Sequence, residues 1–329
     1  LLVERSDFAA GTSSRSTKMV HGGLRYIGEG HLGITREACR ERDLLVKHNP
    51  HLVRPVPLLF PAYRGSKVPL WQVRTVLSLY SALANFRRSS RFRMLDPREV
   101  AEFCPDLRRE GLRGAGLYCD AQVDDARLVL ESLRSARAMG AEAVNHAEAT
   151  AFERDQRGRI ATVRLRDTLE GRSLSVRTHA VVNAAGPALD RVRGLDRPVE
   201  RPTLRPAKGV HLVIPRHRIK ISSGVTFEGR DRRHLFVLPW DEVAIIGTTD
   251  AFSDEIDEPV CTIEEVHYLL SAANEAFPRA ALTTNDLRSV FAGVRPLLAD
   301  PDEDTPSSSV SRELRIEKSP SGLISAAGG

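Results

Sequence analysis

The sequence predicts an α/β fold into which a second, mainly antiparallel domain is inserted. Short apolar runs alternate with helical segments over much of the chain, as they do in parallel α/β units. Three other apolar runs follow one another with only polar connections, which is typical of an antiparallel meander; they cover 208–215, 234–240 and 243–250. The interleaving of these patterns predicts a substrate domain inserted into a nucleotide-binding domain.

Three segments have the composition and end signals of helices. The first, 35–50, is rich in helix formers and stops at a proline. The second, 124–140, starts on acidic capping residues and ends at a glycine. The third, 261–278, has a capping-box pair, Thr262 and Glu265, and one apolar stripe. These helices are expected to be mainly structural.

Composition and charge favour a globular protein of two domains. The 329 residues are 41% hydrophobic and 28% charged, which is enough apolar material for more than one core. The net charge of +5 is spread along the chain apart from a basic stretch at 86–93, so nucleic acid is not an expected partner. That basic stretch could equally face anionic lipid.

The cysteines and the apolar segments exclude further classes. Four scattered cysteines suit neither a disulfide framework nor a zinc site with close ligand pairs, and they indicate a reducing compartment. No window approaches the roughly 18 apolar residues that a membrane-spanning helix needs. The chain is therefore not expected to cross a membrane.

The first four residues, Leu-Leu-Val-Glu, are typical of a short strand that ends in an acidic side chain. In dinucleotide-binding folds such a residue accepts hydrogen bonds from ribose hydroxyls, about 20 residues after a glycine-rich phosphate loop. Counting back from Glu4 places that loop before residue 1, and the last residues stop at a glycine pair. The sequence is therefore interpreted as truncated at both ends. Taken alone, Glu4 could equally end an ordinary strand.

Residues 11–26 concentrate groups suited to an anion and a flat ring. Hydroxyl side chains and close glycines let the backbone approach a phosphate or a ring, and the guanidinium of Arg25 is a planar fork suited to an anion. Each residue alone fits an ordinary loop, turn or surface position. Their combination within sixteen positions indicates a binding site.

A series of motifs resembles the FAD-dependent glycerol-3-phosphate dehydrogenases of the glycine/D-amino-acid-oxidase-like flavoprotein superfamily. The motifs lie in that family's order and at about its spacing over nearly the whole chain. They are ERSDFAAGTSSRSTKMVHGGLRY, YCDAQVDDARLVL, VVNAAGPALD, KGVHLVIPR, LPWDEVAIIGTTD, FAGVRPL and SRELRIEKSPSGLISAAGG. The resemblance implies a Rossmann-like FAD-binding domain of the glutathione-reductase and D-amino-acid-oxidase type, with an inserted antiparallel-sheet substrate domain.

The domain boundaries are predicted on the same basis. The FAD-binding domain would comprise 1–50, 118–202 and 292–329, without its first glycine-rich loop. The substrate-binding domain would comprise 51–117 and 203–291.

The resemblance also assigns cofactor-binding residues. Glu4 would bind the adenosine ribose of FAD. The residues that would follow the pyrophosphate and ribityl chain are Ser13, Ser14, Ser16 and Thr17. Those that would lie near the isoalloxazine ring are Lys18, His21 and Gly22. Those that would pass under the cofactor are Asn183, Ala184 and Gly186, in a turn where Ala185 and Ala188 replace the family's common threonine and tryptophan.

The substrate implied by the resemblance is sn-glycerol 3-phosphate. Arg295 and Arg312 match the family's phosphate-binding arginines, and a dianionic group suits bidentate guanidinium contacts from separate loops. Arg25 and Tyr26 match residues at the substrate side of the flavin.

Two polar clusters have both a site and a structural interpretation. Thr249, like its neighbour Thr248, can donate to the substrate or the flavin edge, whereas Asp250 either orients a nearby cation or caps a turn. The acids at 120, 124 and 125 could suggest a metal, but helix capping and pairing with Arg127 explain them without one. No metal is expected.

The reaction implied is oxidation of the substrate to dihydroxyacetone phosphate, with hydride passing to FAD while a protein base removes the hydroxyl proton. His21 and His211 are the candidate bases, because imidazole titrates near neutral pH, and the sequence does not choose between them. Family members pass electrons to membrane quinone as peripheral proteins. This implies a cytoplasmic protein at the inner face of the cell membrane.

Several alternatives stay open. The protein could be an oxidase that uses oxygen, or a related FAD oxidoreductase acting on an amino acid. The chain as given could also be a non-catalytic fragment, because losing the helix-terminus pyrophosphate site should weaken FAD binding. Whether it forms a homodimer is open as well.

Overall fold

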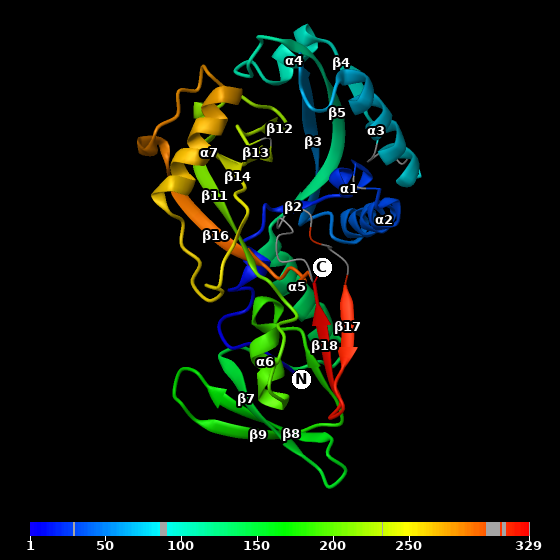
Figure 1. Cartoon of the computed structure of the whole chain (residues 1–329), viewed down its shortest axis with the longest axis vertical. Coiled ribbons are helices and arrows are strands. Elements are labelled where there is room, and N and C mark those ends of the chain that lie inside the picture. Colours follow the sequence, from blue (N-terminus) through cyan, green and yellow to red (C-terminus); the bar gives the residue numbers. More distant parts are fainter. Residues whose placement is uncertain (29, 86–90, 232, 301–309, 311–313, 329) are drawn as a thin grey trace.

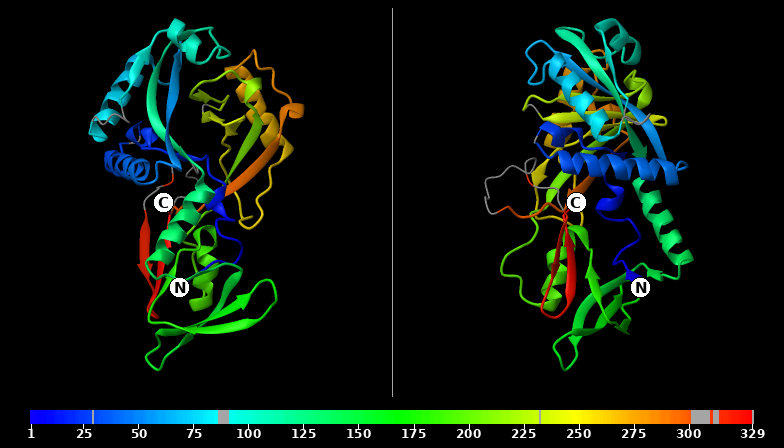
Figure 2. Two further views of the ribbon diagram at one scale, coloured as in Figure 1. Left: turned by 180° about the vertical axis from the view of Figure 1, so that it is seen from behind. Right: turned by 90° about the vertical axis from the view of Figure 1, so that its right-hand side faces the viewer.

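The computed structural model describes residues 1–28, 30–85, 91–231, 233–300, 310 and 314–328. Figure 1 shows an elongated molecule, with a large curved sheet and its helices in one half and several smaller sheets in the other. The N-terminus lies among the smaller sheets. The views in Figure 2 show the same two halves from behind and from the side.

The helices account for all three segments predicted from the sequence. Thr262 and Glu265 form the expected capping box at the start of α7. The helices are α1 Leu24–Gly28, α2 Leu32–His48, α3 Leu70–Leu83, α4 Pro97–Phe103, α5 Asp125–Ala138, α6 Leu189–Asp196 and α7 Ile263–Ala276, with short 3-10 turns η1 Thr12–Ser14, η3 Gly186–Ala188, η4 Arg216–Arg218 and η5 Thr284–Asp286.

The large sheet is mixed and has the strand order β15-β11-β14-β13-β12-β3-β5-β2, with β16 also on β11 and β4 also on β5. All its neighbours are antiparallel except β3 and β12. The strands are β2 Met19–Val20, β3 Val53–Tyr63, β4 Arg93–Leu95, β5 Leu112–Val123, β11 Ala207–Pro215, β12 Gly224–Glu228, β13 His234–Trp240, β14 Val243–Gly247, β15 Ala251–Phe252 and β16 Ser289–Arg295.

Both faces of this sheet are covered by helices. Successive side chains of a strand point to opposite faces, and Leu58 and Leu59 of β3 are both 0% exposed. Leu58 packs in a cluster with Leu77 of α3, whereas Leu59 belongs to a cluster that contains Leu269 of α7. Helices α3 and α7 therefore cover opposite faces, as Figure 1 shows.

The other half contains parallel pairs, as an α/β domain requires. Strand β1 pairs in parallel with β6, and β10 pairs in parallel with β18. A separate antiparallel sheet has the order β7-β8-β9. These strands are β1 Leu2–Val3, β6 Ala143–Val144, β7 Ala147–Arg154, β8 Ile160–Asp167, β9 Ser173–Arg177, β10 Val181–Asn183, β17 Arg315–Lys318 and β18 Leu323–Ala327.

The predicted meander differs in one respect from the structure. Strand β12, which the sequence pattern did not identify, precedes β13 and pairs with it, so the meander is β12-β13-β14. Strand β11 pairs with β14 and not with β13. The long strand β3 was also missed, because Pro55, Pro57 and Pro61 interrupt its pattern and proline is unusual inside a sheet.

Two predicted domain boundaries fall inside strands. Strand β5 runs through 117/118, and β16 runs through 291/292, so the large sheet is continuous across both positions. Among the residues that the structure describes, no helix is long and apolar enough to cross a membrane.

Replacing Leu269 by alanine should destabilise the large-sheet half. Leu269 is 0% exposed between α7 and the sheet, and such a truncation typically costs about 2–5 kcal/mol of unfolding free energy. Ile263→Ala on the same helix is the control, because Ile263 is 55% exposed and its loss should cost no more than about 0.5 kcal/mol. Urea unfolding measures both; equal effects would contradict this packing.

Candidate functional site

The hydroxyl-rich turn at 12–18 is held between β16 and α5. Thr12 Oγ1 donates to the carbonyl of Val294 at 2.6 Å. Ser16 Oγ donates to Asp125 Oδ2 at 2.7 Å, and Lys18 Nζ pairs with Asp125 Oδ1 at 2.5 Å. The turn therefore ends on a carboxylate in the first turn of α5, where the helix dipole favours a negative charge.

The acids near α5 have three separate structural partners. Asp124 caps α5 by accepting from the backbone amide of Arg127 at 3.1 Å. Asp125 pairs with Lys18, and Asp120 pairs with Arg42 at 2.7 Å. The expected capping is present, but the paired cations are Lys18 and Arg42 and not the Arg127 side chain. No metal-ligating group of three acidic, histidine or cysteine side chains occurs among the described residues.

His211 lies in β11 beside this turn. It is 2% exposed, its Nε2 is 2.9 Å from Thr17 Oγ1, and its ring stacks on Phe291 with centroids 4.6 Å apart. Its Nδ1 is buried without a hydrogen-bond partner among the described residues. Burial lowers the pKa of His211 to about 3, and the nearby charges of Arg295 and Lys18 contribute to the decrease. The imidazole is therefore neutral at physiological pH.

Arg295, at the end of β16, is the predicted phosphate-binding residue that the structure places beside His211. Its guanidinium donates to Asp250 Oδ1 at 3.1 Å and to Thr248 Oγ1 at 3.2 Å. It also passes over the backbone of β11, where a Cβ at Gly209 would lie 2.4 Å from Nη2. Asp250 thus orients a neighbouring cation, which was one of its two sequence interpretations.

Thr249 is held by the protein through both functions of its hydroxyl. Its Oγ1 accepts from the amide of Val210 at 2.9 Å and donates to Glu265 Oε1 at 3.2 Å. Glu265 also pairs with Lys208 at 2.9 Å. The Thr249 side chain, 6% exposed, therefore connects the start of α7 to β11.

His21 lies in a turn between β2 and α1. Its Nδ1 accepts from the amide of Gly23 at 3.1 Å, and the side chain is exposed. The amide of Gly22 donates to the hydroxyl of Tyr80 at 2.9 Å and to Asp120 Oδ1 at 3.1 Å, both buried. These two buried partners were not identified from the sequence.

The turn after β10 is ordered by Asn183. Its buried side chain donates to the carbonyl of Leu189 at 2.9 Å and accepts from the amide of Ala185 at 3.2 Å. Gly186 has a φ of +55°, a conformation that favours glycine. Ala184 is exposed, and the 3-10 turn that begins at Gly186 packs against β16.

Glu4 and Ser14 take part in local hydrogen bonds. Glu4 Oε1 accepts from the amide of Ser6 at 2.8 Å, and Ser14 provides its carbonyl to Lys18 Nζ at 2.5 Å. Ser13 is exposed. Arg25 and Tyr26 lie on α1. Arg312 lies outside the described residues.

Asp257 forms two ion pairs that were not predicted from the sequence. They link the segment next to Glu4 to the helix that follows the Asn183 turn. Asp257, in the segment before α7, pairs with Arg5 at 2.6 Å and with Arg191 of α6 at 2.8 Å. Hydrogen bonds from these two arginines lower the pKa of Asp257 to about 2. No periodic pattern marks this loop residue in the sequence.

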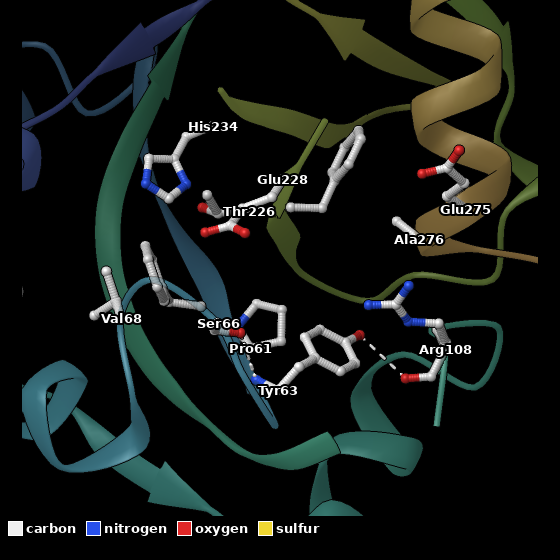
Figure 3. A pocket seen from close by; sticks show the side chains of 12 residues that line it. Pro61, Tyr63, Ser66, Val68, Arg108, Thr226, Glu228, His234, Glu275 and Ala276 are labelled. Atoms are coloured by element: carbon white, nitrogen blue, oxygen red, sulfur yellow. Dashed lines mark hydrogen bonds between the residues drawn. The ribbon is translucent and has the colours of Figure 1, made fainter. Parts of the chain in front are cut away.

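A small pocket lies near the large sheet, away from these contacts. Figure 3 shows it between β3, β12 and α7, with the hydroxyl of Tyr63 donating to the carbonyl of Arg108 at 3.1 Å. Its volume is about 80 Å³, and none of the described residues predicted for the site lines it. Ligand sites usually measure about 300–1,000 Å³, so this pocket does not accommodate a flavin.

The fold joins a parallel α/β part to a large sheet, with a hydroxyl-rich turn and a cationic, histidine-containing region where they meet. Parallel strand pairs beside such a turn are typical of the dinucleotide-binding class of folds. The chain belongs to the DAO family, the FAD dependent oxidoreductases, whose profile matches residues 1–329.

Relatives with assigned names support this placement. The chain is 38% identical to the aerobic glycerol-3-phosphate dehydrogenase of Staphylococcus aureus (strain USA300), over 100% of this chain and 59% of that protein. It is 36% identical to the glycerol-3-phosphate dehydrogenase from Bacillus halodurans complexed with FAD, with a TM-score of 0.79 over 100% of this chain and 55% of that one.

A more distant structure shares the fold alone. The L-alpha-glycerophosphate oxidase from Mycoplasma pneumoniae, with FAD bound, is 16% identical with a TM-score of 0.71, over 100% of this chain and 82% of that one. The chain thus spans less than two thirds of the curated relatives and most of this oxidase.

The residues present fit the family's cofactor. Within the part of the chain that the structure describes, the buried Nδ1 of His211 has no hydrogen-bond partner, and an unsatisfied buried polar atom costs about 1–3 kcal/mol. A polar edge of a flavin ring would supply that partner. The amide of Ser6 donates to Oε1 of the Glu4 carboxylate. The other carboxylate oxygen could therefore accept a hydrogen bond from a ribose hydroxyl.

The low pKa of His211 predicts a pH dependence of stability. Between about pH 6.5 and pH 3 the unfolded chain binds a proton at this residue and the folded chain does not, so stability falls as the pH falls. In His211→Gln, the slope of unfolding free energy against pH between 6 and 4 should be smaller by about 1.4 kcal/mol per pH unit.

The exposed neighbour His217 provides the control for this slope. Urea unfolding at several pH values should give His217→Gln the wild-type slope. An unchanged slope in His211→Gln would contradict a buried neutral imidazole.

Proposed function

We propose that the chain is the FAD-binding and substrate-binding part of an enzyme that oxidises sn-glycerol 3-phosphate to dihydroxyacetone phosphate. The observation that carries the proposal is the position of the Arg295 guanidinium, which Asp250 and Thr248 hold beside the buried His211. The 38% identity of the chain to aerobic glycerol-3-phosphate dehydrogenases supports the same substrate. A fixed guanidinium suits a phosphate ester, because it can make charge-assisted bidentate contacts that an uncharged alcohol cannot offer.

FAD, when bound, supplies the acceptor for the hydride from the substrate's secondary carbon. Glu4 would hold the adenosine ribose, and Lys18 would place its charge near the flavin ring while Asp125 fixes its position. The other residues proposed to hold the cofactor are Ser13, Ser14, Ser16, Thr17, Gly22, Asn183, Ala184 and Gly186. Asn183 would act through its turn, because its side-chain contacts are within the protein.

Arg295 would bind the phosphate of the substrate, with Arg312 as a second cation. Arg25 and Tyr26 of α1 would complete the substrate side of the flavin. Thr249 would act through the backbone that it holds, because both functions of its hydroxyl are already used.

His21 is the better of the two candidate bases. The pKa of His211 is lowered to about 3 and its Nε2 already faces Thr17, so it is a poor proton acceptor. His21 is exposed, and it would accept the hydroxyl proton at Nε2 in the tautomer that carries its hydrogen on Nδ1; in that tautomer Nδ1 no longer accepts from the amide of Gly23. His211 would instead orient the flavin edge.

The proposed electron acceptor is membrane quinone, reached by peripheral association with the inner face of the cell membrane. The name of the 38% identical relatives, aerobic glycerol-3-phosphate dehydrogenase, supports a dehydrogenase. Oxygen is the second candidate, since the fold is shared with a glycerophosphate oxidase. Peroxide released at the full turnover rate without quinone would favour oxygen.

Anaerobic mixing tests the substrate in a polypeptide of the relatives' length. sn-Glycerol 3-phosphate should bleach the oxidised-flavin absorbance rapidly, whereas glycerol and D-amino acids should not, because neither presents a phosphate to Arg295. Bound FAD that is not reduced by sn-glycerol 3-phosphate would exclude this substrate.

His21→Asn should lower the limiting rate of this bleaching by about 100-fold or more, because general base catalysis contributes about 10²–10⁴. FAD content should remain at the wild-type level. His211→Asn is the comparison, and a larger loss there with normal reduction in His21→Asn would reverse the assignment of the base.

A further inference from the structure

A buried ionic cluster lies beneath the turn that carries His21. Arg42 of α2 and Tyr80 of α3 are 0% exposed, and Asp120 of β5 is 4% exposed. The Arg42 guanidinium donates to Asp120 at 2.7 Å and to the Tyr80 hydroxyl at 2.9 Å, and it pairs with Asp43 at 2.9 Å. Three elements distant in sequence therefore meet through one guanidinium.

The Tyr80 hydroxyl uses all its hydrogen-bonding capacity in this cluster. It donates to Asp120 Oδ1 at 2.5 Å and accepts from Arg42 and from the amide of Gly22, both at 2.9 Å. Burial raises the pKa of Tyr80 well above its usual value, and Asp120 contributes to the increase, so the hydroxyl keeps its proton. The Gly22 amide is thus bound by two buried acceptors, Tyr80 and Asp120.

The backbone at Gly22 fits closely against this cluster. A Cβ there would lie 2.3 Å from Cys39 Sγ and 2.3 Å from the Tyr80 hydroxyl, so no other residue fits without a shift. His21 precedes Gly22, and its Nδ1 accepts from the amide of Gly23. The position of the imidazole therefore follows the position of this backbone.

We propose that Tyr80 and Asp120, held by Arg42, are positioning residues for His21. The inference rests on the proposed function, in which His21 accepts the hydroxyl proton. A base has to lie within hydrogen-bond reach of its proton, and a displacement of about 1 Å can cost about 100-fold in rate. Without the Tyr80 hydroxyl, the Gly22 amide keeps only its longer contact with Asp120, and the turn is free to move.

Tyr80→Phe in the FAD-loaded enzyme tests this role, with Tyr118→Phe as the matched control. Tyr118 is 4% exposed, and its ring meets that of Tyr80 edge-on with centroids 6.0 Å apart. Both variants remove one hydroxyl from the same core, but among the described residues the Gly22 amide donates to the hydroxyl of Tyr80 and not to that of Tyr118.

Tyr80→Phe should lower the limiting rate of flavin reduction by about 10- to 100-fold, while FAD content and the dissociation constant for sn-glycerol 3-phosphate change by less than about twofold. Tyr118→Phe should keep the limiting rate within about threefold of wild type. Equal rates in the two variants would overturn the positioning role, because loss of core stability affects both.

Deuterium exchange of a peptide containing Gly22, measured in the oxidised enzyme, provides a readout that needs no substrate. Exchange should rise about tenfold or more in Tyr80→Phe and remain at the wild-type rate in Tyr118→Phe. Faster exchange without slower flavin reduction would also overturn the proposal. If sn-glycerol 3-phosphate fails to reduce the wild-type flavin, the proposed function fails, and the exchange result still reports on the turn.

Asp120→Asn serves if Tyr80→Phe does not fold, because it keeps the side-chain shape and weakens the acceptor. Its control is Asp106→Asn, because Asp106 is 9% exposed and accepts from the amide of Lys220, away from Arg42 and Gly22. The same slower reduction and faster exchange are expected in Asp120→Asn alone, and equal behaviour of the two variants would refute the positioning role.

Discussion

The buried guanidinium of Arg42 is the constraint on which the arrangement of the site depends. A charge removed from water has to be matched by buried partners, and removing one partner typically costs about 3–5 kcal/mol. Arg42 therefore determines where α3 presents Tyr80 and where β5 presents Asp120, and these two residues bind the amide of Gly22. The turn that carries the proposed base is thus bound to the protein core.

Other charged contacts hold the remaining sides of the site. Asp125 binds Lys18, and Asp250 binds Arg295, so each cation is fixed by a carboxylate from another segment. Together these cations and burial keep His211 neutral, as its lowered pKa indicates. The region combines fixed positive charge with a neutral imidazole, which suits an anionic substrate beside a flavin.

Periodicity and end signals predicted the elements that follow local rules. Helices α2, α5 and α7 could be located because their apolar spacing and caps are local properties. Strand β3 could not be located from the sequence, since its three prolines obscure the alternating pattern. The burial of Arg42 could not be predicted either, because the surrounding sequence, CRERD, is typical of a solvent-facing helix. The candidate site followed from a series of motifs, whereas the contacts to Tyr80 and Asp257 depend on tertiary pairing.

The most direct test of the whole account is a crystal structure of the FAD-loaded enzyme with dihydroxyacetone phosphate. The phosphate should contact the guanidinium of Arg295, and the ketone oxygen should lie within about 2.6–3.2 Å of His21 Nε2. A phosphate bound away from Arg295, or a ketone oxygen closer to His211 than to His21, would contradict it.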